Sequence, residues 1–81
     1  MYARQQFGKE LKVKINERVD IYDIGRWSYS IYYEHMLEID DDFREFLINL
    51  NAMEDGPEFE RSYEELEDIA DKLIAGQDVR L

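Results

Sequence analysis

Apolar and charged residues alternate along positions 10–16, in the run Glu-Leu-Lys-Val-Lys-Ile-Asn. In an extended chain the three apolar residues of this run would share one face: Leu11, Val13 and Ile15. This period predicts a half-buried strand, and the two lysines between the apolar residues are typical of a sheet edge. Because a single strand is not stable alone, we expect it to pair with residues 58–60, with the tail 78–81 or with the same strand of a second copy.

The segment after this strand fits two periods. The run Trp-Ser-Tyr-Ser-Ile-Tyr-Tyr alternates and is rich in strand-favouring residues. One alternative is therefore a strand over 26–33, in a three-stranded antiparallel N-terminal sheet with two C-terminal helices. A helix explains more, since polar residues recur at steps of three and four: Asp23, Arg26, Ser30 and Glu34. Asp20 is a suitable N-cap, and Gly25 opposes a helix by only about 1 kcal/mol. We therefore predict a helix at about 21–36.

Two later segments have clearer helical patterns, at about 41–53 and 63–75. The first begins with acidic residues and carries an apolar stripe: Phe43, Phe46, Leu47 and Leu50. The second has a capping box formed by Ser62 and Glu65, and Gly76 follows it where a left-handed residue ends many helices. Its apolar face is equally regular: Leu66, Ile69, Ala70 and Leu73. Together with the strand and the first helix, these segments predict one small, helix-rich α+β domain over residues 1–81.

The composition limits what a chain of 81 residues can be. One small core fits this length, and the absence of cysteine excludes disulfides, thiol catalysis and cysteine metal sites. Apolar residues make up 44% of the chain, which is too many for a disordered protein. No apolar run has the length of a membrane span or a signal peptide, so we expect a cytoplasmic location.

Charge is distributed unevenly along the chain. Residues 34–71 hold fifteen of the twenty acidic residues but only two arginines, a net charge of −13, whereas residues 1–33 carry +2. Such an acidic body repels phosphates, so nucleic acid is not an expected direct partner. About six of these acids lie at the starts of helices, where they interact favourably with the helix dipole. The remaining acids have no such local role.

Four acidic residues would follow one face of the last helix: Glu60, Glu64, Glu67 and Asp71. Like charges at this spacing destabilise a helix by about 0.2–0.5 kcal/mol per pair. No basic residue interrupts them, because Lys72 can pair only with Asp68. A solvated face is the simpler interpretation. The alternative is a docking face for a basic protein partner, with an association that is electrostatically steered and sensitive to salt.

Three tyrosines would border the apolar face of the helix at 21–36: Tyr22, Tyr29 and Tyr33. Trp27 falls on the opposite border. Large rings often serve only to enlarge a small core, but tyrosine and tryptophan are also enriched among the residues that anchor interfaces. Under the second interpretation the acidic stripe steers a partner and the tyrosines anchor it.

No group of residues predicts catalysis, a cofactor or a metal site. His35, the only histidine, has Glu38 three residues away, but two ligands do not define a metal site. The acids at 40–42 lack the spacing of a calcium loop, and the four glycines are isolated, so no phosphate-binding loop is present. We therefore predict a non-catalytic binding or regulatory module for a basic protein surface, of the inhibitor, immunity or nucleic-acid-mimic type. The alternative is a self-associating structural or regulatory protein, a dimer for example.

Overall fold

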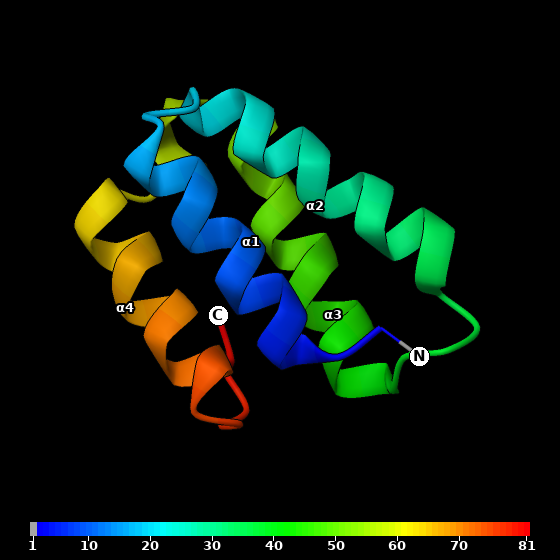
Figure 1. Cartoon of the computed structure of the whole chain (residues 1–81). Coiled ribbons are helices and arrows are strands. Elements are labelled where there is room, and N and C mark those ends of the chain that lie inside the picture. Colours follow the sequence, from blue (N-terminus) through cyan, green and yellow to red (C-terminus); the bar gives the residue numbers. More distant parts are fainter. Residues whose placement is uncertain (1) are drawn as a thin grey trace.

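Residues 2–81, the part of the chain that this computed structural model describes, form an antiparallel bundle of four α-helices (Figure 1). The helices are α1 (Arg4–Asn16), α2 (Ile21–His35), α3 (Asp41–Asn51) and α4 (Tyr63–Ile74). Two single turns of 3-10 helix, η1 (Ala52–Glu54) and η2 (Pro57–Phe59), connect α3 to α4. Successive helices run in opposite directions; α1 packs mainly on α4, and α2 packs on α3 and η1 (Figure 1).

The N-terminal strand predicted at 10–16 is wrong, because these residues belong to α1. This helix buries Phe7, Leu11 and Ile15, which are spaced by four residues, whereas Val13 is 54% exposed. A strand would have placed Val13 on the same face as its apolar neighbours. No strand occurs anywhere in the described chain. The α+β class and the alternative with a three-stranded sheet are therefore both wrong, and the fold is all-helical.

The helices predicted at 21–36, 41–53 and 63–75 are present, and their ends lie within two residues of the predicted positions. Each is preceded by a polar N-cap residue whose side chain accepts a hydrogen bond from a backbone N–H: Asp20, Asp40 and Ser62. The capping box of α4 is complete. Ser62 Oγ accepts from the N–H of Glu65 at 3.1 Å, and the Glu65 carboxylate accepts from the N–H of Ser62 at 3.2 Å.

Aromatic rings fill the centre of the bundle. The ring of Phe7 from α1 stacks on Trp27 from α2, with centroids 4.5 Å apart. It also meets the rings of Phe43 and Phe46 from α3 edge-on, at 5.8 and 5.7 Å. Trp27 is thus partly buried against the core and joins α1 to α2.

Two glycines allow helices to approach closely. Gly8 of α1 faces α4, where an added Cβ atom would lie 2.8 Å from the carbonyl oxygen of Ala70. Gly25 of α2 faces η1, where an added Cβ would lie 3.3 Å from the Cβ of Met53. Next to this contact the fully buried Ser28 donates its hydroxyl to the carbonyl oxygen of Gly25 at 2.7 Å. The buried hydroxyl of Ser28 is therefore hydrogen-bonded, as buried polar groups generally are.

The connection between α1 and α2 is fixed to α4. The Tyr63 hydroxyl donates to the carbonyl oxygen of Val19 at 2.8 Å, and the guanidinium of Arg18 lies 4.9 Å from the centroid of the Tyr63 ring. Arg18 itself adopts a left-handed conformation with φ of 55°. At the other end of α4, Gly76 has φ of 81°, which confirms the predicted helix end.

Candidate functional site

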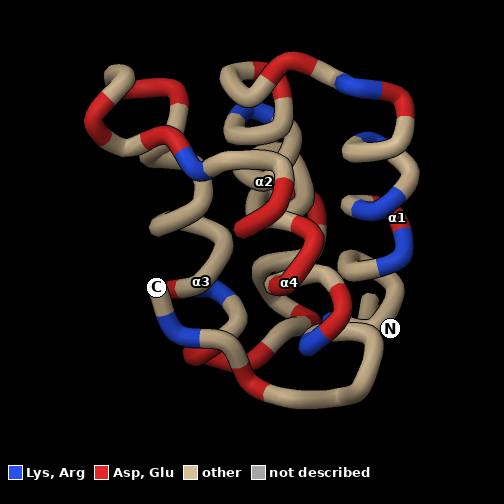
Figure 2. Tube along the Cα trace, turned by 90° about the vertical axis from the view of Figure 1, so that its left-hand side faces the viewer, with Lys and Arg blue, Asp and Glu red and all other residues tan. Residues whose placement is uncertain are grey.

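Six exposed carboxylates lie on η2, the loop after it and the outer face of α4. We call them the acidic surface: Glu58, Glu60, Glu64, Glu67, Asp68 and Asp71. Figure 2 looks onto α4 and shows acidic positions along this helix, with α1 to one side of it and α3 to the other. The four residues of the predicted acidic stripe all belong to this surface.

One residue of the acidic surface is neutralised by a neighbouring helix. Lys12 of α1 reaches across to α4, and its Nζ lies 2.6 Å from a carboxylate oxygen of Asp71. This hydrogen bond raises the pKa of Lys12, and the charge of Glu67 acts in the same direction. The expectation that no basic residue opposes the stripe is therefore wrong at Asp71. It failed because α1 was expected to be a strand, so its lysines could not be placed beside α4.

The rest of the acidic surface has few cations. Lys72 pairs with Asp68 at 3.0 Å, one turn away on α4. Within residues 2–81 no ion pair is formed by Glu58, Glu60 or Glu64. These three carboxylates are exposed to solvent and are free to meet a cation from outside.

An exposed aromatic ring lies within the acidic surface. Phe59 is the last residue of η2, stands between Glu58 and Glu60 in the sequence, and is 50% exposed. Sequence reasoning missed it because residues 58–60 were considered only as a possible partner of the N-terminal strand. The available signal was a phenylalanine that stands between two glutamates and belongs to no apolar pattern. A half-exposed ring beside carboxylates is suited to contact with the apolar stem and charged head of a basic side chain.

The three predicted anchor tyrosines lie together on one side of α2. Tyr22, Tyr29 and Tyr33 are all exposed, and the rings of Tyr29 and Tyr32 contact each other with centroids 5.9 Å apart. However, α2 and α4 lie on opposite sides of α1 (Figure 1). The tyrosines of α2 therefore lie apart from the acids of α4.

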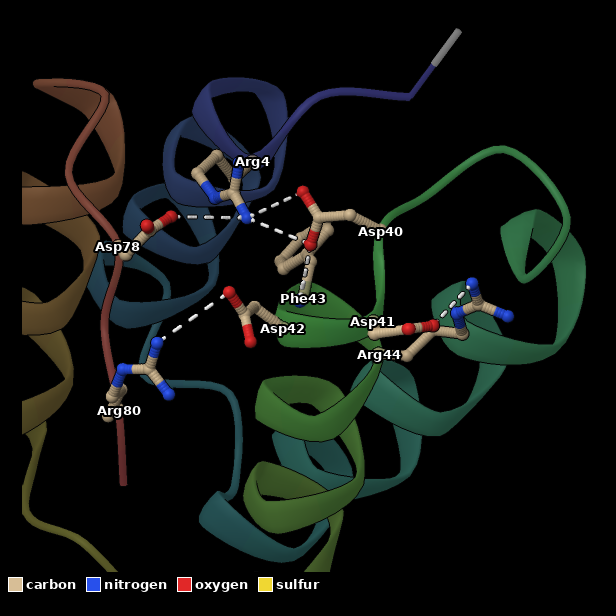
Figure 3. Close-up of polar contacts among 8 residues, drawn as sticks. All are labelled: Arg4, Asp40, Asp41, Asp42, Phe43, Arg44, Asp78 and Arg80. Atoms are coloured by element: carbon tan, nitrogen blue, oxygen red, sulfur yellow. Dashed lines mark hydrogen bonds and ion pairs between the residues drawn. The ribbon is translucent and has the colours of Figure 1, made fainter.

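Arg4 is the centre of an ion-pair cluster at the end of the bundle where α1 and α3 begin (Figure 3). Its Nη2 lies 3.1 Å from a carboxylate oxygen of Asp40 and 3.3 Å from one of Asp78, and its guanidinium lies 5.4 Å from the centroid of the Phe43 ring. The backbone N–H of Phe43, together with Arg4, lowers the pKa of Asp40. A second pair, Arg80 with Asp42 at 3.6 Å, holds the tail after α4 to the first turn of α3.

These pairs hold the tail beside an open groove of about 220 Å³. Its walls are α3 and residues 78–81, and it also reaches Leu73 of α4. Apolar side chains line part of the groove: Phe43, Phe46, Leu73, Val79 and Leu81. Charged and polar side chains surround them: Arg4, Asp42, Glu45, Asn49, Asp78 and Arg80. Sequence reasoning missed this groove, because its walls are far apart in the sequence.

His35 makes local contacts at the C-terminal end of α2. Its Nδ1 lies 2.9 Å from a carboxylate oxygen of Glu38, and this bond lowers the pKa of Glu38. The imidazole also stacks on the ring of Tyr2 at 4.4 Å. Burial, and the bond that the Tyr2 hydroxyl donates to Glu10, raise the pKa of Tyr2. In residues 2–81 no three histidine or carboxylate side chains are placed to hold a metal ion together.

Comparisons with known protein families, curated proteins and solved structures find no match to this chain. Among the described helices, none has the length and apolar character needed to cross a membrane. The function must therefore be inferred from the surface itself.

Proposed function

We propose that this chain is a small, non-catalytic binding module that docks its acidic surface on a basic surface of another protein. The observation that carries the proposal is the state of Glu58, Glu60 and Glu64, which are exposed and form no ion pair within residues 2–81. Phe59 adds an exposed ring between Glu58 and Glu60 in the sequence. An exposed ring next to charged residues is suited to an interface anchor.

The arrangement of charges on α4 has a cost that a purely structural role does not explain. Neighbouring acids at three- and four-residue steps destabilise an isolated helix by about 0.2–0.5 kcal/mol per pair. The same acids produce a negative field that accelerates encounter with a basic partner and weakens as salt is added. Glu64 also interacts favourably with the N-terminus of α4, whereas Glu67 lies beyond the first turn.

Self-association through a paired strand is not supported, because residues 10–16 are helical. Two of the three lysines of α1, which could otherwise meet the acidic body of a second copy, are engaged within the chain. Lys12 pairs with Asp71, and Lys14 lies 4.7 Å from the centroid of the Trp27 ring. The acidic surface therefore gives better support to a basic partner than to a second copy.

The test is capture from a native lysate over a salt series, followed by purification of the captured protein and titration calorimetry. We expect a basic protein that is retained at low salt and released as salt rises. The double variant Glu64→Lys/Glu67→Lys should abolish binding of the purified partner. The matched control Glu17→Lys/Glu34→Lys makes the same change in net charge just after α1 and on α2, and it should bind nearly as well as the original chain. Equal losses in both variants would leave only net charge as the cause and would refute a docking surface on α4.

A further inference from the structure

The groove between α3 and the tail combines an apolar lining with a carboxylate that forms no ion pair within residues 2–81. Phe43, Phe46 and Leu73 are buried in the core and show only their outer edges to the groove. Asp42 and Glu45 lie one turn apart on α3, and both line it. Glu45 forms no ion pair among residues 2–81. The groove therefore offers an apolar surface next to an unpaired negative charge.

The two arginines at the groove differ in how firmly they are held. Arg4 has 22% of its side chain exposed and contacts two carboxylates and the ring of Phe43. Arg80 has 78% of its side chain exposed and makes a single contact of 3.6 Å with Asp42. Figure 3 shows Arg80 reaching Asp42 from the tail, apart from the Arg4 cluster. A long and exposed contact of this kind contributes little stability, so an incoming cation can replace Arg80 at low cost.

We propose that this groove receives an arginine side chain of the basic protein partner. The aliphatic stem of that arginine would lie on Phe46 and Val79, and its guanidinium would bind Asp42 and Glu45. Arginine fits better than lysine because its planar head can bind two carboxylates at once and also stack on rings. The contact of Arg4 with Asp40 and Phe43 is an example of the same recognition within this chain. This inference rests on the proposed function, since it names the contact that the partner makes away from α4.

Charge complementarity favours this occupant over a neutral or acidic one. The groove is lined by three carboxylates, Asp42, Glu45 and Asp78, against the two arginines. An acidic side chain would meet Glu45 and Asp42 at close range and be repelled. A purely apolar one would cover Glu45 and remove its water without supplying a charge, which is unfavourable.

The experiment uses a small probe, so that no partner is needed. N-acetyl-arginine methylamide is titrated into the ¹⁵N-labelled chain, and the shifts of backbone amide signals are followed by NMR. The citrulline analogue, which has nearly the same shape without the charge, is the control ligand. We expect saturable shifts centred on Phe46, Asn49 and Val79, and binding of the citrulline analogue that is weaker by about fivefold or more.

Two variants test separately the charge of Glu45 and the free volume of the groove. Glu45→Gln should weaken binding of the arginine probe by about threefold to fivefold, whereas Glu34→Gln, which makes the same charge change on α2, should not. Asn49→Phe leaves every charge in place and fills the groove, so it should abolish the shifts. Since Glu45, Glu34 and Asn49 are all exposed, these variants should fold.

The inference is overturned by shifts that do not saturate or that spread over all exposed acids, by equal binding of the citrulline analogue, or by equal effects of Glu45→Gln and Glu34→Gln. Its failure is distinguishable from failure of the proposed function. If a partner is captured through α4 but the arginine probe does not bind the groove, only the proposal for the groove is refuted. A groove that binds the probe, together with capture that is unaffected by reversal of Glu64 and Glu67, refutes only the docking surface on α4.

Discussion

Replacing Gly8 with alanine is a direct test of the packing between α1 and α4. An added Cβ would lie 2.8 Å from the carbonyl oxygen of Ala70, 3.0 Å from the Cβ of Leu73 and 3.0 Å from the Cγ1 of Ile74. The first of these atoms belongs to the backbone of α4 and cannot rotate away. The two helices must therefore move apart to accept a single methyl group.

The expected magnitude follows from two opposing effects. Alanine is favoured over glycine in the interior of a helix by about 1 kcal/mol. Overpacking of a well-filled interface costs about 1–3 kcal/mol, and contact with a backbone atom places Gly8→Ala toward the upper end of that range. We therefore expect the free energy of unfolding to fall by about 1–2 kcal/mol. For a domain of this size, the melting temperature should fall by about 4–8 °C for each kcal/mol.

Gly25→Ala is the matched control. Gly25 is also the fifth residue of its helix and is also buried, so the gain in helix propensity is the same. Its added Cβ would meet Met53 and the backbone N of Glu54 at 3.3 Å, which requires a much smaller shift. Urea unfolding followed by circular dichroism should show Gly25→Ala to be more stable than Gly8→Ala by at least about 1 kcal/mol. Equal stabilities, or a Gly8→Ala variant more stable than the original chain, would refute the close packing of α1 on α4.

Three further measurements test the caps and the charges. Ser62→Ala removes one half of the capping box of α4 and should lower the free energy of unfolding by about 1 kcal/mol; an unchanged urea midpoint would contradict this. In Asp40→Asn the amide can still cap α3, but the charge that faces Arg4 is lost. Because the pKa of Asp40 is lowered in the folded state, its ionised form stabilises the fold above the unfolded pKa of about 3.9. That contribution is lost as pH falls through the folded pKa. The stability difference between the original chain and Asp40→Asn should therefore shrink from pH 7 toward pH 3, and a constant difference would contradict the assignment. Finally, added sodium chloride should raise the melting temperature, because it screens the repulsion of a chain with net charge −10. The increase should be smaller in Glu64→Gln/Glu67→Gln, and a melting temperature that falls with salt would show that attractive pairs dominate.

The sequence pattern predicted three of the four helices because each has a local start signal. Asp20, Asp40 and Ser62 cap α2, α3 and α4 with their own side chains. By contrast, the N-cap of α1 is Ala3, whose side chain makes no capping hydrogen bond. The first turn of α1 also has no acidic residue. Over residues 10–16 the exposed Val13 completes an alternating pattern by coincidence. A window extended back to Phe7 shows the competing four-residue period through Leu11 and Ile15, which is the one that the fold uses.

The acidic surface was predictable in part, because helical spacing alone places Glu64, Glu67 and Asp71 on one side of α4. Glu60, predicted on the same helix face, lies in the loop before α4. The contact of Lys12 with Asp71 was not predictable, because the two residues are 59 positions apart in the sequence. The groove beside α3 depends on equally distant contacts. Pairing of this kind follows from the packing of whole helices, which no local pattern determines.

The structure also changes the meaning of the charge asymmetry along the chain. The first 33 residues carry a net charge of +2, which suggests a basic region available for contacts. Five of their six cations instead contact other parts of the fold: Arg4, Lys12, Lys14, Arg18 and Arg26. The first four join α1, or the loop after it, to another helix, and Arg26 of α2 lies 3.9 Å from Glu54 of η1. The negative field of the acidic surface is therefore opposed by a neighbouring helix only at Asp71. A basic partner approaching η2 and the first turns of α4 meets that field, so reversal of Glu64 and Glu67 should reduce the association rate more than it accelerates dissociation.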